Sequence, residues 1–231
     1  MKAKFILAAA LIGLATSAMA LDLQLKTPRM VEIDIDGVKA ANVGATSEAY
    51  LTQLEKLKDD CKSNQTELKS SINATKEVQK ALKSEQSSIQ TTQKQRATDI
   101  KTKQAQMKLR KKDNSSINKQ IKEVNKNKML DNATRSTQLN GLQQRLTKND
   151  NDDRADEATI QNINREIEKL GETLSKNQKN QIEAQNHLNE LNAQLEQNNQ
   201  KMKLIDGEIK VVKGNIKTEK AAAKAAAKAA K

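Results

Sequence analysis

Residues 188–209 read LNELNAQLEQNNQKMKLIDGEI. Leucine, isoleucine and methionine recur here with a period of seven, in one column formed by Leu188, Leu195, Met202 and Ile209 and a second that contains Leu191 and Ile205. Two apolar columns at the first and fourth places of a heptad are typical of helices that pack along a shared seam. The stretch therefore predicts a long α-helix in a coiled coil.

The same heptad register extends over residues 139–216, and a separate register covers residues 51–124. The two registers are out of phase, because the 88 residues from Leu51 to Leu139 equal twelve heptads plus four residues. Between them, residues 125–138 are rich in Asn, Asp, Ser and Thr, which favour helix caps and turns. The sequence predicts that the chain folds back there, near Asp131 and Asn132. A four-residue stutter in one continuous helix is the alternative.

An antiparallel hairpin pairs the two registers so that facing residue numbers sum to about 263. Apolar residues then face each other at Leu54 with Ile209, Leu68 with Leu195 and Ile72 with Leu191. Polar seam positions also meet, at Arg110 with Asp153 and at Asn114 with Asn149. A parallel dimer in register would instead place Arg110 on Arg110, and like charges at a seam are costly. We therefore expect an all-α fold built on a long antiparallel coiled coil.

Three basic residues do not fit this pairing, because Lys58, Arg96 and Lys103 face isoleucines across the seam. Long basic side chains in such places can keep their stems on the apolar surface and their charge in water. Either these layers are weak or a further helix contributes to them. Because the seam contains so many polar layers, the chain is expected to form a homo-oligomer.

The N-terminal region follows a different pattern. Val31, Ile33 and Ile35 alternate with acidic residues before Gly37, which predicts a short β-strand that ends in a turn. The predicted organisation is a signal peptide (1–20), a strand and turn segment (21–46), a first coiled-coil arm (47–124), a turn (125–138), a second arm (139–219) and an Ala/Lys-rich helical tail (220–231).

Residues 1–20 combine two lysines, a short apolar run and the sequence Ala18-Met19-Ala20, a pattern that signal peptidase cleaves. We therefore expect export from a bacterial cell, to the periplasm, the medium or the cell surface. No later stretch approaches the roughly 20 apolar residues of a membrane-spanning helix, so no integral membrane segment is expected after cleavage.

No residue pattern points to catalysis, to a cofactor or to a metal site. The single histidine, His187, has no cysteine or second histidine to complete a zinc site, and the acidic cluster at residues 150–157 lacks the glycine-centred spacing of a calcium loop. Cys61 is the only cysteine and has two open interpretations, a small buried core residue or an intermolecular disulfide. The sequence predicts a protein that is not an enzyme.

Charge is the most informative functional feature. The chain carries a formal net charge of +12, and residues 94–128 hold twelve Lys or Arg against three acidic residues. Such a run is usually a solvated helix face, and the functional alternative is a surface for an anionic partner. The candidate contact residues are Lys108, Arg110, Lys111, Lys112, Lys119, Lys122, Lys224 and Lys228.

These features predict a structural or scaffold protein of the bacterial envelope that spaces or bridges components and touches envelope proteins or anionic polymers. Export makes nucleic acid the least expected of the anionic partners. One alternative is a polyanion-binding protein, for lipopolysaccharide, peptidoglycan or nucleic acid. Another is a holdase chaperone, because the exported, basic, helical-hairpin architecture resembles the Skp/OmpH family. That family has strands on both sides of its helices, whereas this chain ends in Ala and Lys.

Overall fold

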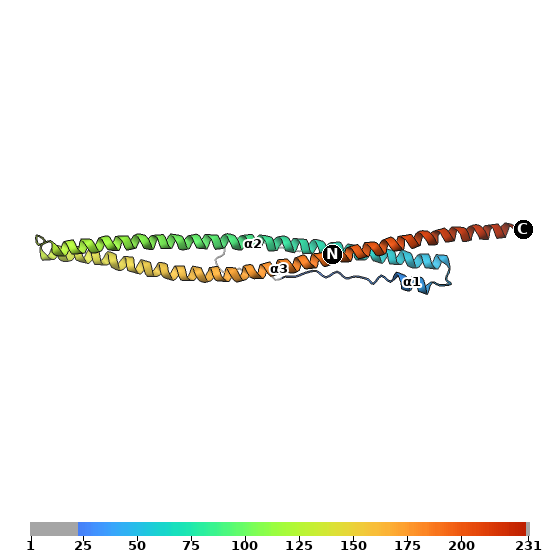
Figure 1. Cartoon of the computed structure of the whole chain (residues 1–231), viewed down its shortest axis with the longest axis horizontal. Helices are drawn as coiled ribbons and strands as arrows, with labels where there is room; N and C mark the ends of the chain where they lie inside the picture. The colour runs from blue at the N-terminus through green and yellow to red at the C-terminus, as the bar shows by residue number, and fades with distance from the viewer. Residues whose placement is uncertain (1–22, 230–231) are drawn as a thin grey trace, which may run out of the picture. The chain divides into compact units, whose positions relative to one another are not determined.

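The computed structural model describes residues 23–229, so the predicted signal peptide at residues 1–20 lies outside the described part of the chain. Three helices follow one another, α1 (Ile35–Ala41), α2 (Ser47–Lys126) and α3 (Asn132–Ala229) (Figure 1). The two long helices pack against each other, and residues 23–229 contain no β-strand. The all-helical prediction is confirmed. Within the described residues, no helix is long and apolar enough to cross a membrane.

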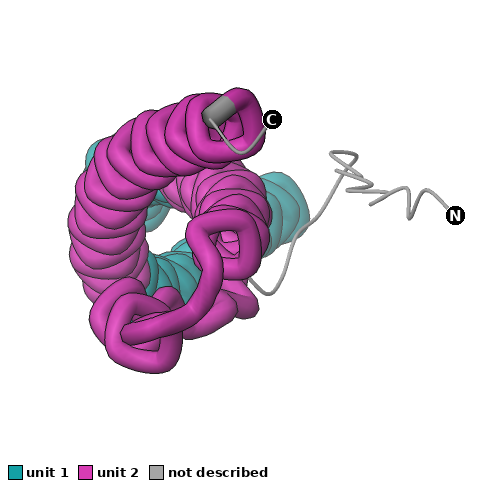
Figure 2. Tube along the Cα trace, turned by 90° about the vertical axis from the view of Figure 1, so that its right-hand side faces the viewer, with its two compact units in different colours: residues 1–20, 85–177 teal, residues 21–84, 178–231 magenta. Residues whose placement is uncertain are grey.

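The chain divides into two compact units, of which unit 1 contains residues 85–177 of the described chain (Figure 2). In this unit α2 ends at Lys126, residues 127–131 reverse the chain, and α3 begins at Asn132. Asp131 caps α3, because its carboxylate accepts hydrogen bonds from the backbone N–H of Thr134 at 2.8 Å and from the Thr134 hydroxyl at 2.6 Å. These bonds also lower the pKa of Asp131.

Arg135 holds the same turn from the other side. Its Nη2 donates to the carbonyls of Asn127 at 2.9 Å and Leu130 at 3.1 Å, and so satisfies backbone oxygens that the end of α2 and the turn leave without a helical partner. The two predictions for this region agree with the structure: α2 and α3 run antiparallel, and the reversal lies next to Asp131 and Asn132.

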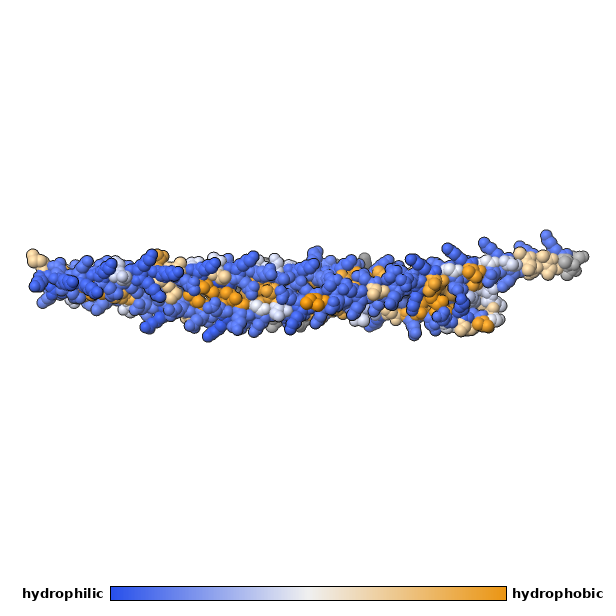
Figure 3. Space-filling model, viewed as in Figure 1, coloured by the Kyte–Doolittle hydropathy of each residue, from blue (hydrophilic) through white to orange (hydrophobic). Residues whose placement is uncertain are grey.

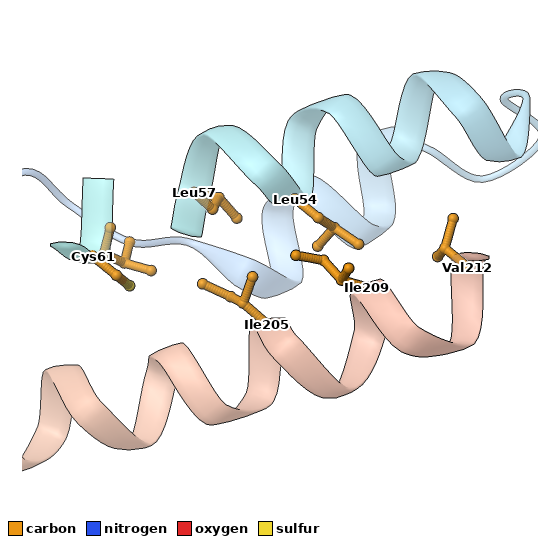
Figure 4. Packing of buried hydrophobic residues seen from close by; sticks show 7 residues of the cluster. Leu54, Leu57, Cys61, Ile205, Ile209 and Val212 are labelled. Atoms are coloured by element: carbon orange, nitrogen blue, oxygen red, sulfur yellow. The ribbon is translucent and has the colours of Figure 1, made fainter. Parts of the chain in front are cut away.

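Unit 2 contains residues 23–84 and 178–229 of the described chain. Its largest apolar cluster joins α2 to α3 through Leu54, Leu57, Cys61, Ile205, Ile209 and Val212 (Figure 4). A second cluster contains Leu68, Ile72 and Leu191, with Leu188 and Leu195 packed against it. The predicted pairs Leu54–Ile209, Leu68–Leu195 and Ile72–Leu191 therefore fall within common clusters, which confirms the antiparallel register in this unit.

Hydrophilic side chains cover most of the face seen in Figure 3.

The predicted strand at residues 31–36 is wrong. Residues 23–34 have no regular secondary structure, and Ile35 begins helix α1, which Asp34 caps by accepting a hydrogen bond from the N–H of Gly37 at 2.8 Å. The alternation of apolar and acidic residues reflects an extended backbone. The N–H and carbonyl groups of this backbone form hydrogen bonds with a side chain instead of a partner strand. Asn64 of α2 accepts from the N–H of Val31 and donates to its carbonyl, both at 2.7 Å.

Cys61 lies in the core of unit 2 and is completely buried. Burial raises the pKa of its thiol above the ordinary value, because the charged thiolate loses hydration there. Asn198, also buried, donates to the Cys61 carbonyl at 2.8 Å. This environment favours the interpretation as a core residue, since a disulfide to a second chain would require the core to open.

Candidate anionic-partner surface

The seam of unit 1 contains a cluster of ion pairs between the two long helices. Arg110 Nε donates to Asp153 at 2.6 Å, Arg110 Nη2 pairs with Asp156, and Lys103 Nζ lies 2.8 Å from Asp156. The Asp156 side chain is only 8% exposed, and its two basic partners hold its pKa below the ordinary range. The predicted pair Arg110–Asp153 is confirmed.

This cluster changes the role of one candidate contact residue. The guanidinium of Arg110 is bound on both sides by carboxylates, and its side chain is 18% exposed. The same interactions raise its pKa, with the hydrogen bond to Asp156 as the largest cause. Arg110 therefore joins α2 to α3 and does not lie on the surface with its basic neighbours.

A further acidic side chain of unit 1 links α2 to α3. Asp113 pairs with Arg145 at 3.0 Å and accepts from Asn149 at 2.9 Å. Asn149 also donates to Asn114 at 2.7 Å, which confirms the predicted polar layer. These contacts fix the register of the two helices by polar pairing in a part of the seam that has few large apolar residues.

The three basic residues that do not fit the apolar seam all find acids on the opposite helix. Arg96 Nε lies 2.9 Å from Glu166, and Lys103 contacts Asp156 as described. In unit 2, Lys58 Nζ lies 2.6 Å from Asp206. Their side chains are 32–37% exposed, which agrees with the expectation that the charged ends of these residues reach solvent.

The remaining basic residues of α2 in unit 1 lie on the face away from α3. At 3.6 residues per turn, seven of them fall within an arc of roughly 80° on the side opposite Arg110 and Ile117. We call them the lysine stripe: Lys94, Lys101, Lys108, Lys112, Lys119, Lys122 and Lys126.

All seven stripe residues are exposed, and no ion pair joins any of them to another residue of the described chain. Lys111, at the edge of the stripe, is also exposed. From Lys94 to Lys126 the stripe extends about 48 Å at 1.5 Å per residue. Unit 1 thus has a row of exposed cations that form no ion pair within the described chain, although one exposed acid, Glu123, lies next to the row between Lys119 and Lys126.

The structure places the candidate residues in different surroundings. Lys108, Lys112, Lys119 and Lys122 belong to the stripe, and Lys111 borders it. Lys224 and Lys228 lie in unit 2, near the end of α3, where the side chains of residues 217–228 are exposed. Sequence reasoning did not place Lys94, Lys101 and Lys126 in the contact set, although they lie fourteen and seven residues before Lys108 and seven residues after Lys119, a spacing that was available as a signal.

Acid should weaken the Asp156 cluster. Because the pKa of Asp156 is lowered in the folded chain, its carboxylate stabilises the fold above about pH 4 and this contribution is lost as the pH falls further. Asp156→Asn takes away the carboxylate that pairs with Arg110 and Lys103, and should lower the free energy of unfolding by about 1–3 kcal/mol at pH 7. Urea unfolding at pH 7 and pH 3 measures both effects. A stability loss on acidification that is as large in Asp156→Asn as in the wild type would contradict this role.

Among residues 23–229, no group of three or more His, Cys, Asp and Glu side chains could hold a metal ion. No protein-family model, curated protein sequence or solved structure matches the chain. A function must therefore be proposed from the geometry and charge of the described residues.

Proposed function

We propose that the chain is a non-enzymatic scaffold of the bacterial envelope, which spaces or bridges components and binds an anionic partner along the lysine stripe of unit 1. The observation that carries the proposal is the stripe itself, a row of exposed lysines that form no ion pair with a described residue. Each lysine held near an anionic surface contributes about 1 kcal/mol, so a row of this kind reaches useful affinity without an enclosed pocket.

The stripe lies along one face of the long helix α2, and this limits the form of the partner. A helix face about 48 Å long fits an extended polymer or a flat surface better than a small anion, which would contact only one or two lysines. Phosphate groups are the shared chemistry of these partners, as they occur both in linear polyanions and in lipid headgroups. Lysine binds phosphate as a point charge and requires no bidentate geometry.

The experiment measures binding of the full chain to two phosphate probes. Long-chain inorganic polyphosphate represents a polymer, and vesicles with and without an anionic phospholipid represent a surface. We expect binding to at least one anionic probe, no binding to neutral vesicles, and a steep loss of affinity as salt rises, because salt cations compete with the lysines for the phosphate groups. Equal affinity for neutral and anionic vesicles, or no binding to either anionic probe at low salt, would rule out the proposal.

The two arms of this experiment separate the sources of phosphate. Tight binding to polyphosphate with weak binding to vesicles identifies a polymer partner. The opposite ranking identifies a lipid surface. Either outcome agrees with the proposal.

A further inference from the structure

In unit 2 an extended segment of the chain packs against both α2 and α3, and we call the α2–α3 surface that receives it the groove. The segment is the arm, residues 23–41, which comprises the irregular residues 23–34 and helix α1. Ile33 is its anchor, since its side chain is only 6% exposed and belongs to the same cluster as Leu57 and Ile205. Ile35 and Val38 of α1 pack against that cluster. Residues of the arm thus complete the apolar cluster that α2 and α3 form.

The helices also bind the backbone of the arm. Asn64, which is 1% exposed, contacts both the N–H and the carbonyl of Val31 at 2.7 Å. Lys201 Nζ donates to the carbonyl of Ile33 at 3.1 Å, and the His187 ring lies 3.2 Å from the carbonyl of Lys26. Bonds to backbone atoms together with one apolar side-chain pocket are how proteins bind extended peptides.

Charge pairs lie toward each end of the arm. Lys26 Nζ lies 3.7 Å from Glu67 of α2 and donates to Ser70 at 2.9 Å. Lys39 of α1 lies 3.0 Å from Glu208 of α3. The groove therefore recognises a peptide with an aliphatic anchor between two basic residues, and the arm of any copy of this chain has that pattern.

A short, exposed loop connects the arm to α2. Residues 42–46 form the loop, Gly44 has a φ of 86°, and the side chain of Val43 is 86% exposed. A left-handed glycine permits this sharp reversal, and a modest backbone rotation there would carry the arm away from its own groove. Exchange of an identical element between copies costs little, because every contact is recovered in the partner.

We propose that the groove of unit 2 takes residues 23–41 of a second copy, so that exchanged arms join two chains. In the exchanged pair the two connecting loops pass between the copies. The exchange itself does not depend on the proposed scaffold function. Only its biological role, which is to link copies of the scaffold, rests on that function. Failure of the lysine stripe to bind anions would leave the exchange intact.

Zero-length cross-linking tests the exchange with the unmodified chain. A carbodiimide joins the Lys39 amine to the Glu208 carboxyl as an amide, because these groups are in contact. Equal amounts of light and 15N-labelled chain are unfolded together, refolded and cross-linked. Mass spectrometry of the linked peptides then shows whether Lys39 and Glu208 come from the same chain. Complete exchange predicts mixed light–heavy products in about half of the linked peptides, as random pairing of two chains requires.

The pair Lys213–Glu55, at 3.1 Å, is the internal control, because it joins α3 to α2 within the hairpin. We expect its linked peptides to be purely light or purely heavy. The proposal fails if Lys39–Glu208 peptides are equally unmixed, since the arm then binds only its own groove. It also fails if both pairs are mixed, since the helices themselves then exchange, or if Lys213–Glu55 links form but no Lys39–Glu208 link does.

Discussion

Replacing Ile205 with Ala should lower the free energy of unfolding of unit 2 by about 2–5 kcal/mol. The Ile205 side chain is fully buried in the cluster that joins α2, α3 and the arm. Its truncation removes contacts with all three segments and leaves a cavity that helices locked by polar layers cannot easily close. Amide hydrogen exchange of peptides from residues 47–84 and 178–216 reports the stability of this unit directly.

The adjacent residue supplies a matched control. Leu204 is 62% exposed, so Leu204→Ala should change stability by less than about 0.5 kcal/mol. The two substitutions remove side chains of the same size, one position apart on the same helix. Equal losses in the two variants would mean that α3 presents a different face to α2.

Much of the helical pairing could be predicted because it follows from periodicity. The phase shift between the two heptad registers placed the turn, and opposite charges at Arg110 and Asp153 distinguished an antiparallel pair from a parallel one. Asn114 with Asn149 gave the same register independently. These contacts are predictable because a helix face repeats at fixed spacing, so residues far apart in the chain acquire definite partners once the turn is placed.

The arm could not be predicted in this way. Val31, Ile33 and Ile35 alternate as in a strand, but alternation only shows that the backbone is extended and does not name its partner. Here the partner is the amide side chain of Asn64, more than thirty residues away on a helix. Hydrogen bonds from a side chain to a distant backbone leave no periodic pattern in the sequence.

The candidate surface was predicted in part, for a similar reason. Net charge identified the basic region, but it did not separate Arg110, which binds carboxylates in the seam, from Lys108 and Lys112 on the opposite face. Only the helix orientation makes that distinction. It also shows that the stripe extends to Lys94 and Lys126, at heptad spacing from residues already in the set.

Neutralising four stripe lysines should reduce affinity for an anionic surface by about 1000-fold. The variant carries Gln at Lys108, Lys112, Lys119 and Lys126, and each lysine near such a surface contributes about 1 kcal/mol. The fold should be retained, because these residues have no ion pair within the described chain and Gln is nearly as good a helix former as Lys. For a polymer, the slope of affinity against salt should also become shallower, since fewer counterions are exchanged.

The most direct measurement compares this variant with one of equal net charge in the same polyphosphate and vesicle assays. The second variant carries Gln at Lys69, Lys203, Lys210 and Lys217, which are exposed in unit 2 and lie outside the candidate contact set. We predict that the stripe variant loses binding while the unit 2 variant stays within about threefold of the wild type, an energy of about 0.6 kcal/mol. Equal losses in both variants would show that net charge alone attracts the anion, and would contradict a contact surface on the lysine stripe.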